Sequence, residues 1–211
     1  MTMRIEKLTT APDRAGRYRV EFEDGTVMRL YRQTLEDHGL YPGKELTEEE
    51  FHSLQSDASA MSAKMRAVRI VSAANVSARD LKQRLIHKGE DPEQAAAAVQ
   101  WMEDLDLLDD RKTAEQIVDR CARQGYGIAR AKQMLYEKQI PKALWDEVLA
   151  DYPSQTDKIA DFLRGKLGND WDQKTLKRVI DAAMRRGHSY PEIRKALSIL
   201  QADTDDFPEE W

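Results

Sequence analysis

The strongest constraint on the fold of this chain is a sequence phrase that recurs three times. The copies are LKQRLIHKGEDPEQAAAAV (residues 81–99), AKQMLYEKQIPKALWDEVL (131–149) and VIDAAMRRGHSYPEIRKAL (179–197). The first and third align without a gap, so that Ile86 falls on Met184 and Gly89 on Gly187, while the second has Gln139 in place of the glycine. Repetition at a period of about 50 residues predicts a modular helical array in which each unit buries its apolar face against the next.

Helix start signals divide each copy into short helices. Thr47 to Glu50, Ser77 to Asp80, Ser154 to Asp157 and Ser189 to Glu192 have the form of a capping box, and the pair Asp109-Asp110 is expected to cap a helix that begins near Arg111. The apolar residues recur at helical spacing and indicate core faces. The expected helices are 58–74, 77–88, 92–107, 112–124, 128–138, 141–151, 155–167, 173–186 and 190–201.

The first 45 residues have a different pattern. Tyr18, Val20 and Phe22 alternate with charged residues, and Asp24-Gly25 follows, which is typical of a β-hairpin because both turn residues tolerate positive φ. Residues 4–8 are expected to add a third strand. Residues 33–38 then predict a short helix that ends at Gly39.

The expected fold class is therefore mainly α: tandem three-helix repeats in an elongated array, preceded by a small β-hairpin or three-stranded segment. The predicted organisation is a β-rich segment over 1–45, repeats over 46–110, 111–153 and 154–202, and an acidic tail over 203–211.

Charge is distributed unevenly along the chain. The net charge is −5, yet three blocks each carry +5: residues 61–90 (7 Lys/Arg against 2 Asp/Glu), 120–142 (6 against 1) and 158–195 (10 against 5). The acidic total argues against a polycation that coats nucleic acid, but locally basic faces remain open. The alternative is that these charges only solvate helix surfaces.

The sequence offers no catalytic signature. The four histidines lack partners at metal-ligand spacing, Cys121 stands alone, and no nucleotide-binding or nucleophile motif is found. We interpret Gly125-Tyr126-Gly127 as an inter-helix turn, His188 as a surface turn residue, and Trp101, Trp145 and Trp171 as packing anchors. The expectation is a protein without catalytic residues, metal or cofactor. The absence of an apolar spanning or signal segment, with one cysteine, predicts a cytoplasmic protein.

Three strings carry a family resemblance: SARDLKQRLIHKG, LDLLDDRKTAEQIVDRCARQGYGIARAKQMLYEKQI and LKRVIDAAMRRGHSYPEIRKAL. They resemble the RecX family, the bacterial regulators of the RecA recombinase, over residues 60–200 and into the N-terminal strands. The resemblance implies a curved array of three-helix repeats that lodges in the groove of the RecA–single-stranded DNA filament. It also implies modulation, usually inhibition, of RecA's ATPase, strand exchange and co-protease activity, without catalytic residues. Many members are basic overall, and this chain departs from them in being acidic.

The resulting hypothesis is a monomeric, non-enzymatic modulator of RecA filaments. Its expected contacts with the filament or with phosphates are exposed cations on the repeats: Arg79, Lys82, Arg84, Arg120, Arg123, Arg130 and Lys132. Direct contact with single-stranded DNA remains open. The alternative function is a nucleic-acid-binding helical module with no dependence on RecA.

Overall fold

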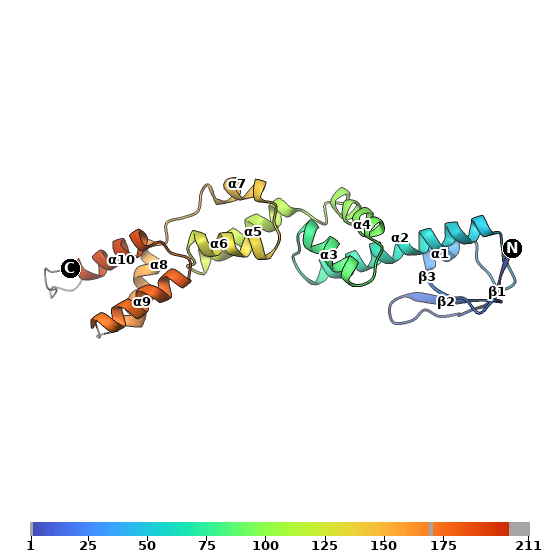
Figure 1. The fold of residues 1–211 in the computed structure, drawn as a ribbon, viewed down its shortest axis with the longest axis horizontal. Coiled ribbons are helices and arrows are strands. Elements are labelled where there is room, and N and C mark those ends of the chain that lie inside the picture. The colour runs from blue at the N-terminus through green and yellow to red at the C-terminus, as the bar shows by residue number, and fades with distance from the viewer. Residues whose placement is uncertain (1, 169–170, 203–211) are drawn as a thin grey trace. The chain divides into compact units, whose positions relative to one another are not determined.

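The computed structural model describes residues 2–168 and 171–202 of the chain. The expected acidic tail over 203–211 lies outside the described residues. The chain divides into two compact units, Met1–Leu108 and Asp109–Trp211, and each is described by itself (Figure 1). The described part contains ten α-helices and one small antiparallel sheet, which confirms the mainly helical fold class.

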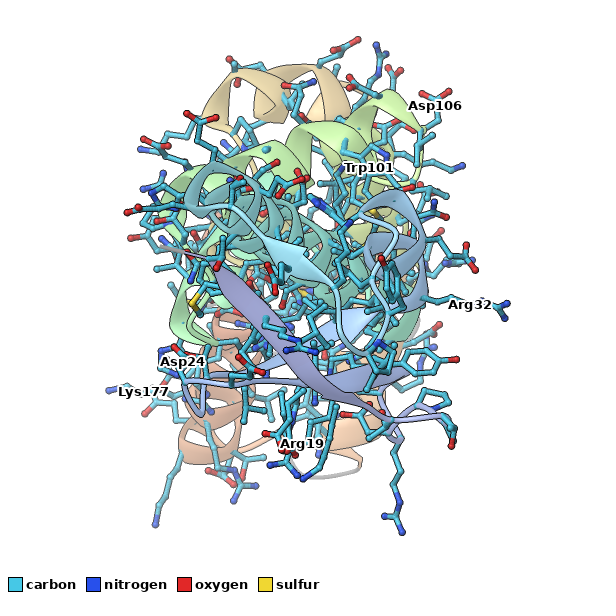
Figure 2. The ribbon with its side chains drawn as sticks, turned by 90° about the vertical axis from the view of Figure 1, so that its right-hand side faces the viewer. Arg19, Asp24, Arg32, Trp101, Asp106 and Lys177 are labelled. Carbon is cyan, nitrogen blue, oxygen red and sulfur yellow. The ribbon has the colours of Figure 1, made fainter. Side chains whose placement is uncertain are left out.

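The first unit begins with a four-stranded antiparallel sheet of order β3-β2-β1-β4. Its strands are β1 (Met3–Leu8), β2 (Arg17–Phe22), β3 (Val27–Tyr31) and β4 (Glu45–Leu46). The hairpin at Asp24-Gly25 is confirmed (Figure 2). Of its two turn residues only Gly25 has a positive φ, of 84°, and the Asp24 carboxylate accepts a hydrogen bond from the Thr26 amide at 2.9 Å. The fourth strand was not expected, because two residues carry no alternation for a sequence pattern to reveal.

The sheet buries one face against a helix. Val20, Phe22 and Leu30 on the strands pack with Leu54 of the long helix α2 (Glu48–Ala73), and the rings of Phe22 and Phe51 meet edge to face at 5.2 Å. The short helix α1 (Arg32–Asp37) completes this first core. Helix α2 therefore covers the apolar face of the sheet, so no second sheet is needed to bury that face.

Helix α2 begins ten residues earlier than expected and extends past the sheet into the first repeat (Figure 1). Thr47 Oγ1 accepts from the Glu50 amide at 3.2 Å, and the Glu50 carboxylate accepts from the Thr47 amide at 2.8 Å, so the predicted capping box starts the helix. No glycine or proline interrupts residues 48–73. The expected start near residue 58 was wrong for this reason.

Three helices form the first repeat. The carboxyl-terminal half of α2 packs with α3 (Ala78–His87) and α4 (Pro92–Asp104) around a core that includes Leu81, Leu85 and Met102. Ser77 and Asp91 cap the two shorter helices through their side chains. Trp101 packs against this core and carries Lys64 Nζ 5.4 Å from its ring centroid, as expected of a packing anchor.

The second unit contains two further three-helix groups. Their helices are α5 (Asp110–Arg123), α6 (Ile128–Glu137) and α7 (Trp145–Leu149, after a 3₁₀ turn at Lys142–Leu144), then α8 (Thr156–Leu167), α9 (Gln173–Arg185) and α10 (Tyr190–Ala202). Asp109 caps α5 as predicted, accepting from the Lys112 amide at 2.9 Å. Helix α7 is shorter than the expected 141–151, because Pro141 is extended and a 3₁₀ turn precedes the helix.

The middle helix of each repeat ends in the same left-handed turn. Gly89 and Gly187 both have φ of 89°, and Gln139 adopts φ of 56° at the equivalent position. In each repeat the following amide donates to the carbonyl five residues back, which is the Schellman arrangement: Glu90 to Leu85, Ile140 to Leu135 and His188 to Ala183. The threefold sequence phrase thus corresponds to a threefold local structure. The exact domain boundaries given above remain predictions.

Candidate interaction surfaces

The loop between α5 and α6 docks onto the turn between α9 and α10. The Gly127 amide donates to Arg186 O at 2.9 Å, and the Ala129 amide donates to Gly187 O at 3.3 Å. The Tyr152 hydroxyl donates to Tyr126 O at 2.7 Å, and burial raises the pKa of this phenol to about 12. The glycine-rich segment is an inter-helix turn, as expected, and it also joins two repeats.

Two residues of the α9–α10 turn have structural roles that the sequence did not reveal. The Arg186 guanidinium lies 4.6 Å from the Tyr126 ring and 5.0 Å from the Phe162 ring, and it donates to Gln124 O at 2.7 Å. His188 is only 5% exposed, with Nε2 3.0 Å from Gly125 O. The expectation of a surface His188 was wrong, because the turn is covered by the α5–α6 loop. Burial lowers the pKa of this imidazole.

The predicted contact cations lie in both units. In the first unit, Arg79 and Lys82 of α3 are exposed, whereas Arg84 is half-buried and bonded through Nε to Asp80 at 2.8 Å. In the second unit, Arg120, Arg123 and Lys132 are exposed, and Arg130 is half-buried with Nη1 3.6 Å from Glu137. Burial raises the pKa of the Cys121 thiol, and the charges of Arg130 and Arg120 oppose this shift. Whether any of the seven contacts a partner stays a prediction.

An exposed apolar residue occupies the same position in all three repeats. It directly follows the core residue of the middle helix and is Ile86 in the first repeat (39% exposed), Tyr136 in the second (69%) and Met184 in the third (49%). A single exposed apolar residue needs no explanation, but a position that recurs near the ends of the three equivalent helices α3, α6 and α9 does. The alignment of the sequence repeats already paired Ile86 with Met184, and the structure adds that both side chains are exposed.

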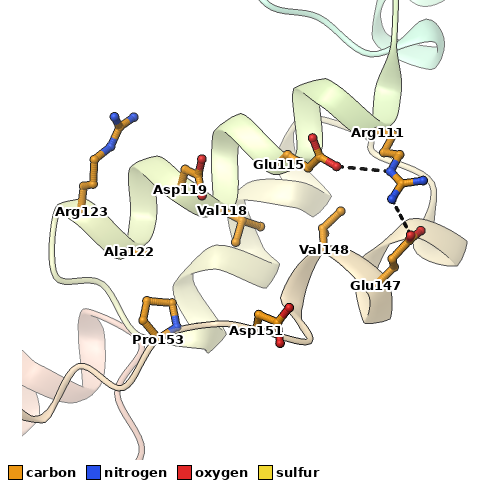
Figure 3. Close-up of a pocket in the computed structure, with 10 residues that line it drawn as sticks. All are labelled: Arg111, Glu115, Val118, Asp119, Ala122, Arg123, Glu147, Val148, Asp151 and Pro153. Atoms are coloured by element: carbon orange, nitrogen blue, oxygen red, sulfur yellow. Dashed lines mark hydrogen bonds and ion pairs between the residues drawn. The ribbon is translucent and has the colours of Figure 1, made fainter.

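A hollow of about 430 Å³ lies between α5 and α7 (Figure 3). Arg111 bridges the two helices at one end of the hollow, donating to Glu115 at 3.2 Å and to Glu147 at 2.6 Å, while Val118 and Val148 form its apolar part. Its lining holds no histidine, cysteine or hydroxyl nucleophile. Within the described ranges, no group of three or more histidine, cysteine, aspartate or glutamate side chains is arranged to hold a metal ion.

A second hollow, of about 400 Å³, lies between α2 and α3, and we call it the α2–α3 groove. Its lining contains four cations and no carboxylate: Arg66, Arg69, Ile70, Ala73, Ala74, Arg84 and Lys88. Arg84 and Lys88 also line an adjoining hollow of about 360 Å³ with Asp80, Gln83 and His87. Of these cations, only Arg84 was among the predicted contacts, since sequence spacing cannot show that α2 and α3 face one another here.

Comparison with known proteins finds similarity to the RecX family. Residues 109–149 match the model described as RecX, second three-helix domain. The regulatory protein RecX of Streptococcus sanguinis is 24% identical over 203 residues, which cover 94% of this chain and 79% of that protein. The regulatory protein RecX of Vibrio campbellii is 27% identical over 146 residues, covering 68% of this chain and 94% of that protein.

Solved structures share the fold. A crystal structure of regulatory protein RecX superimposes with a TM-score of 0.67 at 18% identity, covering 93% of this chain and 99% of that one. RecX from Lactobacillus salivarius gives 0.60 at 19% identity over 68% of this chain and 97% of that one. These two structures show the fold, and the matches to the family model and to the curated relatives confirm the resemblance found in the sequence. None of the helices in the described part of the chain combines the length and apolar character needed to cross a membrane.

Proposed function

We propose that this chain, a member of the RecX family, binds the RecA–single-stranded DNA filament and modulates it, chiefly by inhibition. The curated relatives are named regulatory proteins, and the modulated activities would be RecA's ATPase, strand exchange and co-protease functions. The protein acts as a cytoplasmic monomer and contributes no chemical step of its own.

The observation that carries the proposal is the repeated exposed position occupied by Ile86, Tyr136 and Met184. A filament is built from identical subunits, so it offers the same surface again and again. A protein that presents one apolar side chain from each of its repeats suits such a partner better than it suits a single small ligand. Partly exposed aromatic and Met side chains are the residue types enriched at protein interfaces.

Cations near these apolar positions support the same partner. Lys82 and Lys132 precede Ile86 and Tyr136 by four residues, so each pair shares one face of its helix. Arg79, Arg84, Arg120, Arg123 and Arg130 complete the proposed contact set. Acidic protein surface, or the phosphates of the bound strand, would satisfy these charges and speed association.

Repeated weak contacts explain how such a protein would inhibit. When one repeat is bound, the next binds at a high effective concentration, so that modest individual contacts add to firm attachment. Attachment to more than one protomer would hold the filament in a state that cycles nucleotide poorly or would block its growing end.

The test is co-sedimentation of the full chain with RecA, in the presence and absence of single-stranded DNA and of nucleotide. The expected result is pelleting of this protein only when filaments form, together with a lower rate of DNA-dependent ATP hydrolysis. A chain that remains in the supernatant with assembled filaments, at micromolar concentrations of both proteins, would refute the proposal.

A further inference from the structure

The α2–α3 groove holds its guanidinium groups in place before any ligand binds. Arg66 Nε lies 2.8 Å from the buried Glu90 carboxylate, and Arg66 Nη1 donates to Lys88 O at 2.7 Å. Ser62 Oγ lies 3.0 Å from the same Glu90 oxygen. Because these contacts fix the guanidinium plane, the entropy lost when an anion binds to its remaining N–H groups is small.

The Arg69 guanidinium is held by the N-terminal sheet region and not by the first repeat. Its Nη2 donates to Ala15 O at 2.7 Å and to the Tyr31 hydroxyl at 3.0 Å, so the β1–β2 loop and the end of β3 hold this guanidinium group. Both acceptors are neutral. The full charge of Arg69 is therefore not balanced by a carboxylate in the described structure.

A charge count gives the groove a net positive lining. Arg66 pairs with Glu90 and Arg84 with Asp80, while Arg69 and Lys88 have no carboxylate partner among the described residues. Two unbalanced cations thus share a hollow with two guanidinium groups that keep free N–H donors. Guanidinium groups bind phosphate through paired N–H donors, and a concave surface with one sign of charge concentrates the opposite ion.

A further basic hollow lies beside the residue that binds Arg69. Ala15 lies between Asp13 and Arg17, and these two line a hollow of about 340 Å³ with Arg19 and Arg29. Arg17 pairs there with Asp13 and Arg19 pairs with Glu21, so Arg29 is the cation of this hollow that has no carboxylate partner among the described residues. A ligand with a single anionic group would use only one of these places. A chain of regularly spaced phosphates would use several, and neither the groove nor this hollow is lined by an aromatic ring that would select particular bases.

We propose that the α2–α3 groove binds the sugar–phosphate backbone of a single nucleic-acid strand, directly and without sequence preference. The Arg66, Arg69 and Lys88 side chains contact phosphate oxygens, and Ile70 and Ala73 lie under the sugars. This inference goes beyond the proposed function because it requires no RecA.

The experiment measures binding of the full chain to a fluorescent oligothymidylate by anisotropy, without RecA, over a series of salt concentrations. The test variant is Arg69→Gln with Lys88→Gln, which removes the two unbalanced charges. Each phosphate contact on a single strand contributes about −0.7 to the slope of log K against log salt, so the variant should lose about 1.4 from the slope and bind about 25-fold more weakly at 0.1 M salt.

The matched control is Arg32→Gln with Lys7→Gln. These exposed cations lie in the same unit but outside both hollows, and Arg32 points away from the ribbon (Figure 2). The control removes the same formal charge and should retain wild-type affinity within about twofold. Circular dichroism melts of both variants check that they fold.

Three results would overturn the inference. The first is absence of oligonucleotide binding by the wild type at 0.1 M salt. The second is equal affinity of the test variant and the control. The third is competition by a polyglutamate peptide of equal charge as effective as competition by unlabelled oligonucleotide, since that would identify the groove as a site for acidic protein. None of these results bears on co-sedimentation with RecA filaments, so the two proposals fail separately.

Discussion

Gly127 and Gly187 meet backbone to backbone where the second repeat joins the third. A methyl group on Gly127 would overlap the carbonyl of Gly187, and a methyl group on Gly187 would overlap the Arg130 amide. Gly187 also needs its positive φ to end α9, whereas Gly127 has an ordinary φ of −79°. At Gly127 it is therefore the close approach, and not the backbone conformation, that excludes a side chain.

Replacing Gly127 with alanine should destabilise the second unit. The added methyl group has no space and meets main-chain atoms, which cannot move away as a flexible side chain could. We expect a loss of about 3 kcal/mol, at the upper end of the cost of overpacking, measured by urea denaturation. The matched control is Gly165→Ala, because Gly165 lies inside α8 with nothing near its Cβ position. That change should stabilise the helix by about 0.5–1 kcal/mol, and equal midpoints for the two variants would contradict the packing argument.

Stability of the same junction should fall as the pH is lowered. Nε2 of His188 lies by a carbonyl and must carry the proton of the neutral ring, so Nδ1 is buried without a partner. The pKa of His188 is lowered from 6.5, chiefly by burial. The unfolded chain therefore binds the proton first, and stability declines as the pH falls through about 6.5 toward the lower folded pKa.

The measurement is the free energy of unfolding at a series of pH values between 8 and 5. One such group contributes at most about 1.4 kcal/mol per pH unit. The variant His188→Gln should be less stable at pH 8 but should lack this part of the pH dependence. A wild-type protein with constant stability over the range would show that the imidazole is not held neutral. The lowered pKa of Glu192 acts only below about pH 4.5, outside this window.

The sequence predicted those features whose partners lie within a few residues of each other. The Thr47–Glu50 box and the Asp109 cap both depend on local backbone geometry. The expected Ser154–Asp157 box was wrong, because α8 begins after Gln155 and has no side-chain cap. The sequence also failed for His188, because the group that buries it comes from another repeat, about 60 residues earlier in the chain. A contact between residues so far apart in the chain produces no periodicity in the sequence, so sequence patterns cannot predict it.

The candidate sites divide in the same way. The cations of α3 were recognised from their spacing along one helix. The α2–α3 groove was not, because Arg66 and Arg69 belong to a different helix and only tertiary packing brings them to Arg84 and Lys88. The repeated position of Ile86 and Met184 was visible in the alignment, but apolar residues at helical spacing are usually core, and their exposure follows from where each helix packs.

Reversing three charges on α5 and α6 should relieve inhibition of RecA. The variant combines Arg120→Glu, Arg123→Glu and Arg130→Glu, and the readout is RecA's DNA-dependent ATPase at increasing concentrations of the variant. If these cations face acidic surface or phosphate, repulsion should raise the half-inhibitory concentration more than tenfold, which corresponds to about 1.4 kcal/mol or more.

A charge-matched control comes from the same unit. Lys174, Lys177 and Arg178 of α9 are exposed and lie outside the proposed contact set, and their replacement by glutamate changes the net charge equally. This control should inhibit like the wild type. Full inhibition by a folded Arg120, Arg123 and Arg130 variant would remove these residues from the interface.

Truncating the repeated apolar position should weaken filament binding without weakening the fold. The variant combines Ile86→Ser, Tyr136→Ser and Met184→Ser, all at exposed positions. Each anchor at a protein interface is worth about 1 kcal/mol or more, so the triple variant should co-sediment with RecA filaments at least tenfold more weakly. Because the lost contacts are apolar, the loss should persist at high salt, whereas the loss caused by charge reversal should shrink as salt screens the wild-type contacts.

Ile199→Ser is the matched control, since Ile199 is also 39% exposed but lies on α10 outside the repeated position. If the triple variant and this control bind filaments equally, the recurrence of exposed apolar residues has no part in recognition, and the charged residues alone must account for attachment.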